Sequence, residues 1–384
     1  MRASGNWKAL IALVGASALL LSGCGASATD APSNASGQFD AASYFKGKTI
    51  RLIVSHDAGG GSDLAARAFA ASLGDLVPGG PRVTVTNNSG MAGIRDALDA
   101  PEADLVMGMT SLGANLYQPI LDPANTYDPK AVQIIGSVSP EPRGALVAGD
   151  FAAAYPKLVD AEGKTATPIR FAAVVGSPAD VISEAMTAPW VCEHLKLPCD
   201  MIAVAGDTSA DTELMLQRGE VNSNFTAIGA ISRSHREILT DRSGYVAFTY
   251  DDEGSKVTYP DGMTVPPKLN DLIPADAKAE WESIQPLVTG GGLGKTFWMG
   301  KSASSGVVDT LRQAWTDFTK DPKLYGPFAQ AQGGGSEGGI SFDVAPIPGA
   351  DGQKLYDTST QTFLDSRDAY SKIQTDLYDK YWAK

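Results

Sequence analysis

The sequence has few of the residues that most often carry catalysis or bind metals. Its 384 residues include three histidines and three cysteines. His56, His194 and His235 lie in separate segments, with neither the H-E-x-x-H nor the zinc-type C-x-x-C spacing of common metal sites. We also find no pairing of a nucleophile with a base. We therefore expect a protein that is not an enzyme and that needs no metal and no cofactor.

Positive charge is also scarce. The chain has 31 Lys and Arg residues against 44 Asp and Glu residues, which gives a formal net charge of −13. General binders of nucleic acid or of anionic membranes need a basic surface, so we expect no nucleic-acid partner. An anionic ligand would have to be held by local N–H donors. Local donors can bind an anion despite the net negative charge of the chain, because salt screens exposed charges beyond about 8–10 Å.

A long apolar run is missing too. The N-terminal run Ala9–Leu21 is shorter than the roughly 20 residues that span a bilayer. Leu21-Ser22-Gly23-Cys24 follows it and matches a lipobox, so residues 1–23 are predicted to be a lipoprotein signal peptide. Lipid on Cys24 would hold the protein outside the cytoplasmic membrane. A short membrane anchor with an incidental cysteine is the alternative.

The segment after Cys24 is predicted to be a flexible linker, residues 24–46, because residues 25–38 are small or polar. Two cysteines remain, Cys192 and Cys199. Outside the cytoplasm a disulfide between them is the expected state, and closing so short a loop contributes about 2–3 kcal/mol. A metal site that includes His194 is the alternative, although the spacing is not that of a zinc site.

The most informative local pattern is a glycine-rich turn between a predicted strand and a predicted helix. Ile50–Val54 is apolar except for Arg51, Ser55–Asp63 contains three successive glycines, and Leu64–Leu76 has helical periodicity. Glycine lets a ligand approach the backbone closely. A helix N-terminus adds unpaired N–H groups and the positive end of its dipole, so the pattern predicts an anion site. A tight turn capped by Ser62 or Asp63 is the alternative.

Two acidic residues in this turn need separate interpretation. Asp57 puts a negative charge where an anion site would not be expected to have one; its side chain either points away or pairs with a cationic group of the ligand. Asp63 and Arg67 are spaced i,i+4, which predicts a surface ion pair between them.

A second glycine-rich stretch, Thr289–Thr296, imitates a nucleotide-binding P-loop. Thr289 replaces the first glycine of the motif, and Phe297–Met299 after it has the character of a strand rather than a helix. We therefore expect no nucleotide site there.

Predicted strands and helices alternate over much of the chain, which indicates βαβ units and parallel sheet. The strands are expected at 49–54, 82–86, 104–109, 132–139, 144–148, 169–174, 201–204, 221–226 and 296–299, and the helices at 62–76, 94–98, 114–121, 179–194, 211–218, 230–239, 277–285, 307–320 and, broken, 352–382. Polar turns follow several strands, as in α/β folds that bind ligands beyond the carboxyl ends of their strands. They fall into two groups, 56–111 and 176–208, which we expect to face each other across a cleft.

The order of these turns resembles that of the receptor subunits of tripartite tricarboxylate transporters, an extracytoplasmic solute-binding family. Gly59-Gly60-Gly61-Ser62-Asp63 followed by Ala66-Arg67 is similar to the first turn and helix of the family. Asn87–Gly93 resembles its Asn-Arg-Pro-Gly-Ala-Gly-Gly turn, and Tyr127-Asp128-Pro129, Gly176-Ser177 and Gly219–Asn222 resemble later motifs. Asp180 stands where the family usually has histidine.

The resemblance implies an α/β, two-domain periplasmic-binding-protein fold of the Venus flytrap, type II-like kind. Each domain would contain a mixed or parallel sheet, with an interdomain cleft between them. Residues 47–142 would form the first segment of domain 1, and residues 143–245 would form domain 2. Residues 246–384 would return to domain 1 with C-terminal helices.

The expected function is that of a lipid-anchored, monomeric solute receptor, which closes on a small carboxylate and delivers it to membrane transporter subunits. An extracytoplasmic hydrolase or transferase, and a ligand-binding sensor without a transporter, are the alternatives. The expected ligand-binding residues, several of which act through main-chain N–H groups, are His56, Gly59, Gly60, Gly61, Ser62, Gly90, Ala92, Thr110, Gly176, Ser177 and Asp207.

Overall fold

A computed structural model of the protein describes residues 37–111, 127–204, 210–250, 256–289, 291–333 and 339–383. The described residues from Ala41 onward form one compact unit. The predicted signal peptide, Cys24, the predicted helix at 114–121 and Asp207 lie outside the described residues. No described helix is both long enough and apolar enough to cross a bilayer.

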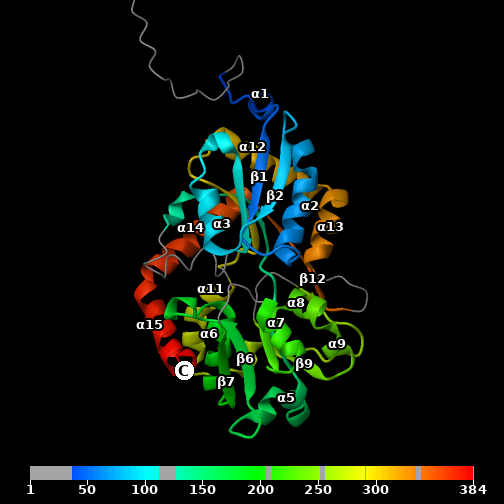
Figure 1. Cartoon of the computed structure of the whole chain (residues 1–384), viewed down its shortest axis with the longest axis vertical. Coiled ribbons are helices and arrows are strands. Elements are labelled where there is room, and N and C mark those ends of the chain that lie inside the picture. Colours follow the sequence, from blue (N-terminus) through cyan, green and yellow to red (C-terminus); the bar gives the residue numbers. More distant parts are fainter. Residues whose placement is uncertain are drawn as a thin grey trace, which may run out of the picture. The chain divides into compact units, whose positions relative to one another are not determined.

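The first sheet is mixed, and the strands at one edge of it, β3, β1 and β2, have the predicted parallel arrangement (Figure 1). β1 pairs in parallel with both β2 and β3, while β11 pairs antiparallel with β3 and β4. The strand order is β13 (Pro346–Pro348), β4 (Val132–Val138), β11 (Lys295–Gly300), β3 (Val106–Ser111), β1 (Thr49–Val54) and β2 (Arg82–Asn87). The predicted bounds of β1 are confirmed, since five apolar or β-branched residues bounded by a glycine turn favour a strand.

Helices cover this sheet through their apolar faces. α2 buries Ala65, Phe69 and Leu73, which recur every four residues along one side. Phe69 lies against Phe297 and Trp315, with ring centroids 4.8 and 5.1 Å apart, and so joins α2 to the sheet. The helices packed here are α2 (Gly61–Leu76), α3 (Gly90–Leu98), α12 (Ser305–Lys320), α13 (Pro322–Gln332) and α14 (Gly349–Asp365).

A second group of strands follows after the chain leaves β4. β5 (Arg143–Ala148) pairs antiparallel with β8 (Ser223–Ala227) on one side and with β9 (Gly244–Thr249) on the other. β6 (Ile169–Val174) and β7 (Cys199–Val204) form a parallel pair. The structure is thus α/β with mixed sheets in two groups, which is the predicted fold class.

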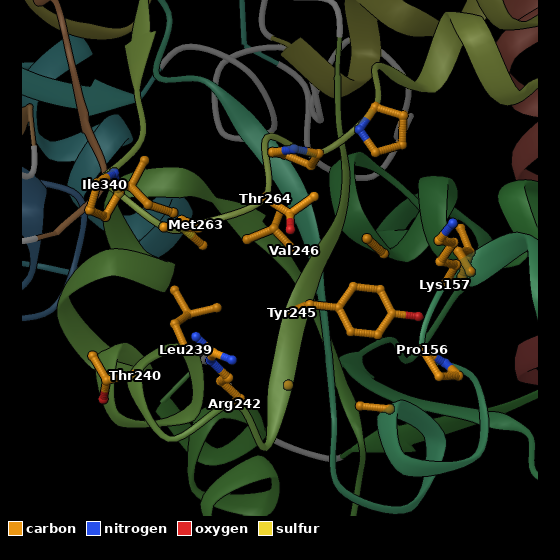
Figure 2. A pocket seen from close by; sticks show the side chains of 18 of the residues that line it. Pro156, Lys157, Leu239, Thr240, Arg242, Tyr245, Val246, Met263, Thr264 and Ile340 are labelled. Carbon is orange, nitrogen blue, oxygen red and sulfur yellow. The ribbon is translucent and has the colours of Figure 1, made fainter.

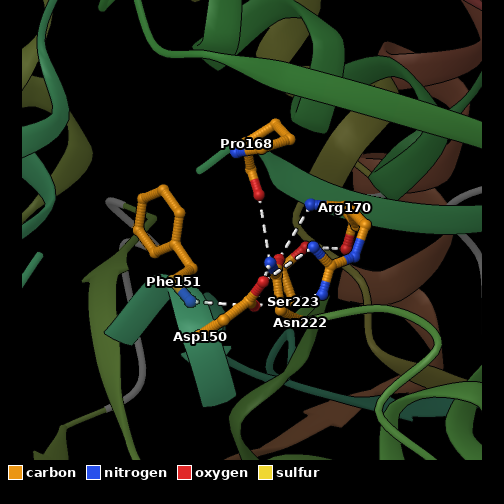
Figure 3. Close-up of polar contacts among 6 residues, drawn as sticks. All are labelled: Asp150, Phe151, Pro168, Arg170, Asn222 and Ser223. Carbon is orange, nitrogen blue, oxygen red and sulfur yellow. Dashed lines mark hydrogen bonds and ion pairs between the residues drawn. The ribbon is translucent and has the colours of Figure 1, made fainter. Parts of the chain in front are cut away.

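A polar cluster around Asn222 joins β6 to β8, the strand that begins directly after Asn222 (Figure 3). The Asn222 amide donates to Asp150 Oδ1 and to the Pro168 carbonyl, at 2.9 and 3.0 Å. Its oxygen accepts from the Arg170 N–H at 2.8 Å, and Arg170 pairs with both oxygens of Asp150. These bonds, led by those from Arg170, lower the pKa of Asp150. The Gly219–Asn222 motif therefore has a structural role.

Replacing Asn222 by Ala is expected to lower the free energy of unfolding by about 2–3 kcal/mol. Asn222 is 2% exposed, and its removal leaves buried donors and acceptors unpaired, at about 1–3 kcal/mol each before relaxation. Urea unfolding measures the loss. Gln361→Ala, which removes an exposed amide from α14, should change stability by no more than about 0.5 kcal/mol. Equal effects of the two substitutions would contradict the role of Asn222.

The helices of the second group are mostly short. They are α5 (Gly149–Ala154), α6 (Ser183–His194), α7 (Ala210–Gln217), α8 (Ile228–Ser234), α9 (Arg236–Thr240), α11 (Lys278–Thr289) and α15 (Arg367–Leu377), the last followed by a π-helix at Tyr378–Trp382. The predicted helix at 230–239 is in fact two helices, α8 and α9. The chain leaves the helical conformation at His235, which is buried and lies 3.0 Å from Asn224.

The predicted disulfide is confirmed: Cys192 in α6 is bonded to Cys199 at the start of β7. His194 does not join them. Its ring lies 4.2 Å from that of Trp190, and its Nε2 lies 3.6 Å from Glu280. His194 therefore belongs to the packing between α6 and α11.

The C-terminal part packs on both groups of strands. β11, α12, α13 and α14 pack on the first sheet, but α11 and α15 pack on α6. Trp281 of α11 lies 5.1 Å from Trp190 of α6, and Trp382 donates to the Ala185 carbonyl. Burial of these two large rings explains why the chain crosses back.

Candidate functional site

The two glycine-rich turns of the first sheet are held together by Asp63. Its carboxylate accepts from the Gly59 N–H at 2.9 Å, from the Asn87 amide at 3.0 Å and from Arg67 at 2.9 Å. Burial alone would raise the pKa of Asp63, but these bonds outweigh burial and lower it. The predicted ion pair with Arg67 is present, and the Arg67 side chain is half exposed. Asp63 itself is 3% exposed, so it connects the two turns from a buried position.

Asp57 has a similar structural task. The Ser89 hydroxyl donates to Asp57 Oδ1 at 2.5 Å, which ties the first turn to the residue just before α3. The Asp57 carboxylate therefore faces the second turn and has a partner there.

The N-terminus of α2 keeps main-chain donors available. Gly59 adopts a φ of +84°, which turns the chain into the helix, and its N–H is used by Asp63. The Gly61 and Ser62 N–H groups make no hydrogen bond with any described residue, because Leu64 is the first residue whose N–H bonds back into the helix. No side chain caps this helix, so Ser62 and Asp63 are not N-caps. Asp63 instead accepts from the residue before Gly60.

The N-terminus of α3 lies beside it. The Gly90 N–H donates to the Ser55 carbonyl, so this predicted donor is occupied, while Met91 and Ala92 follow in the first turn of the helix. α3 begins at Gly90 rather than at the predicted Ile94, because Gly93 lets its first turn press on the preceding loop. A Cβ on Gly93 would lie 1.9 Å from the Asn88 carbonyl oxygen.

Two cations that the sequence did not identify lie next to Gly61. A Cβ built on Gly61 would be 3.2 Å from an Arg233 guanidinium nitrogen and 3.7 Å from Lys295 Nζ. Arg233 comes from α8 in the second group of strands, and Lys295 begins β11 in the first. The site therefore combines a helix N-terminus with two side-chain cations, a combination that attracts a carboxylate.

A buried carboxylate accompanies these cations. Glu141, in the segment between β4 and β5, accepts from Lys295 Nζ at 2.8 Å. Burial would raise the pKa of Glu141, but Lys295, Arg233 and Arg143 outweigh it and lower that pKa. Arg143 in turn pairs with Glu184. The local charges are thus nearly balanced before a ligand arrives.

His56 lies in the same electrostatic environment. Burial and the neighbouring Lys295 lower its pKa to about 4, against an opposing effect of Asp57. The imidazole is therefore neutral at physiological pH, and it adds no charge to the site.

The pKa of His56 makes stability depend on pH. The imidazole of the unfolded chain binds a proton near pH 6.5, whereas the folded protein resists protonation down to about pH 4. We expect the free energy of unfolding to fall by up to about 3 kcal/mol as the pH drops between these values. Urea unfolding at pH 7, 6, 5 and 4 measures it. In His56→Gln this contribution should vanish, and profiles that run parallel for the two proteins would contradict the assignment.

The remaining predicted residues lie elsewhere or are already bonded. Thr110 is fully buried in β3, opposite Thr296 of β11. The Gly176 and Ser177 N–H groups both donate to Asp180 Oδ2, at 3.0 and 2.8 Å, so a ligand would have to displace that carboxylate.

The glycine stretch that imitates a P-loop leads into a strand, as predicted. β11 begins at Lys295, directly after the loop. The lysine that completed the false motif is one of the two cations beside Gly61. The sequence contains only a single lysine after glycines and a single arginine in a helix. Neither pattern indicates that the two side chains meet at one site.

Comparison with known proteins identifies the fold. No protein-family model matches the sequence, and no curated protein matches it. A TctC solute-binding protein from Polaromonas, solved without ligand, is similar in structure, with a TM-score of 0.54, 15% identity and coverage of 86% of this chain and 99% of that one.

Two structures from Rhodopseudomonas palustris are also similar. MatC with bound malate gives a TM-score of 0.52 and 12% identity, over 86% of this chain and 100% of that chain. A second protein, with adipate, gives 0.57 and 12%, over 86% and 98%. At these identities the likeness establishes the fold alone. The chain has the two-domain α/β fold of periplasmic solute-binding proteins, as its resemblance to tripartite tricarboxylate transporter receptors predicted.

Proposed function

We propose that this protein is an extracytoplasmic solute receptor, not an enzyme, that binds a small carboxylate at the N-termini of α2 and α3. The observation that carries the proposal is the approach of Lys295 and Arg233 to Gly61 at the start of α2. Charge-assisted hydrogen bonds contribute about 1.5–3 kcal/mol each, enough to overcome the net negative charge of the chain. The bound malate and adipate of the two R. palustris proteins support the same ligand class.

The two cations come from different groups of strands, so a ligand between them would draw those groups together. We propose that residues 47–142 and 143–245 act as the two closing domains, with parts of residues 246–384 packed on each. Closure would exclude water and strengthen every electrostatic contact with the ligand. Lipid on Cys24 would keep the closed receptor at the membrane, where a transporter could accept the ligand.

Calorimetric titration with mono-, di- and tricarboxylates tests the site. Gly61→Val should weaken binding at least about tenfold, because its side chain would enter the space between the two cations. Gly326→Val is the matched control. Gly326 is an exposed residue of α13, and a Cβ built there has no heavy atom within 4 Å. Equal affinities of the two variants, or no heat with any carboxylate, would refute the proposal.

The anchor is tested separately. Cys24→Ala should release the protein from the membrane fraction while carboxylate binding persists. Retention of that variant at the membrane would favour the alternative of a membrane-anchoring segment.

A further inference from the structure

A large cavity lies beside β9, away from the cation pair at Gly61 (Figure 2). Its volume is about 880 Å³, within the range of small-molecule sites. None of Gly61, Lys295 and Arg233 is among the residues that line it. The cavity is therefore separate from the proposed carboxylate site.

The walls of the cavity combine apolar surface with positive charge. Its apolar part includes Leu239, Val246, Met263 and Ile340, together with several prolines. Its charged residues are three cations, Lys157, Arg236 and Arg242, against one acid, Asp261. This is the reverse of the whole chain, in which acids outnumber cations by 44 to 31. Such a local reversal favours an anionic ligand.

The cations lie on opposite sides of an apolar middle. Figure 2 shows Arg242 with Leu239 on one side, Lys157 with Pro156 on the other, and Tyr245 between them. The Tyr245 hydroxyl donates to the Tyr155 carbonyl at 2.7 Å, which fixes its ring as part of the wall. Met263 and Thr264 lie above it in this view, and the Thr249 N–H holds their loop by donating to the Pro267 carbonyl.

Two backbone features add to the evidence. Arg242 has a φ of +62°, a left-handed conformation that is uncommon outside glycine and that marks functional positions more often than chance. β9 pairs with β5 on one side, and on its other side Thr249 forms a bridge with Lys268. Only the part of this edge before Thr249 can therefore present main-chain N–H groups to a ligand.

We infer that this cavity is a second ligand site, for an organic anion with an extended apolar body, of the class of medium-chain fatty acids. The carboxylate would bind Arg242, and the chain would lie along Leu239, Val246 and Met263. The inference does not depend on the proposed carboxylate site, because the two share none of the residues that carry either argument.

Hydrogen-exchange mass spectrometry of the full-length chain with sodium octanoate tests the site. Octanoate should protect amides in residues 239–249 and 259–267, with or without additional protection at the carboxylate site in residues 56–63. Acetate, which has the carboxylate without the alkyl chain, should bind far more weakly, since each buried CH₂ increases the affinity about fourfold. Octan-1-ol, which has the alkyl chain without the negative charge, should bind at least about tenfold more weakly than octanoate.

Substitutions sharpen the test. Arg242→Asn removes the charge, and Asn tolerates the left-handed backbone, so octanoate affinity should fall at least about tenfold while the fold is retained. Arg218→Asn is the matched control, since Arg218 is largely exposed at the end of α7 and does not line the cavity. Gly61→Val, which acts at the proposed carboxylate site, should leave octanoate protection at 239–249 unchanged. No binding of octanoate, protection at 56–63 instead, or equal affinities of Arg242→Asn and Arg218→Asn would each overturn the inference.

Discussion

Replacing Lys295 by Gln is expected to destabilise the protein by about 3–5 kcal/mol. Lys295 is 7% exposed, and its ammonium is the direct partner of buried Glu141 at 2.8 Å. Removing one member of a buried ion pair leaves the other charge without compensation, which is costly. Arg233 and Arg143 also act on Glu141, so the loss should fall toward the lower end of this range. Urea unfolding at pH 7 measures it.

A double variant separates the structural role of Lys295 from its role in binding. Lys295→Gln with Glu141→Gln replaces both charges by amides, so most of the lost stability should return. Carboxylate affinity should remain at least about tenfold below that of the wild type, because the cation beside Gly61 is still missing. If the double variant bound carboxylates normally, Lys295 would be a purely structural residue and Arg233 would carry the site alone.

The first strand, turn and helix could be predicted because their signals are local. An apolar run, three glycines and a helical repeat follow one another within thirty residues, and the structure has β1 and α2 at those places. The second turn was also recognised, although α3 begins inside it. Small residues resemble a loop in sequence, and Gly93 is needed only because of its contact with the Asn88 carbonyl.

The cations of the site could not be predicted, because they meet only in the folded chain. Arg233 and Lys295 come from different groups of strands and are far from Gly61 in sequence, and neither belongs to a motif that indicates anion binding. The Gly176–Ser177 turn shows the converse problem. Its pattern indicates N–H groups that are available to a ligand, but the Asp180 carboxylate already accepts from the N–H groups of both Gly176 and Ser177.

Asp63 should be the residue on which the geometry of the first site most depends. Replacing it by Ala removes bonds to Gly59, Asn87 and Arg67 at once. Hydrogen bonds to a buried charge contribute about 1.5–3 kcal/mol each and are not additive, so we expect a loss of about 3 kcal/mol in the free energy of unfolding. Because the pKa of Asp63 is lowered in the fold, its contribution is present above pH 4 and is lost as the pH falls further.

The change in carboxylate affinity caused by this substitution tests the site more directly than the change in stability does. Asp63 has no direct contact with the space beside Lys295, but it fixes the turn from which the Gly61 and Ser62 N–H groups point. Loss of that turn should weaken carboxylate binding about tenfold or more, even at temperatures where the variant is fully folded. Asp75→Ala, at an exposed position of the same helix, should leave both stability and affinity within about 0.5 kcal/mol. A folded Asp63→Ala protein with wild-type affinity would show that the main-chain donors of α2 take no part in binding, and would leave the two cations as the whole of the site.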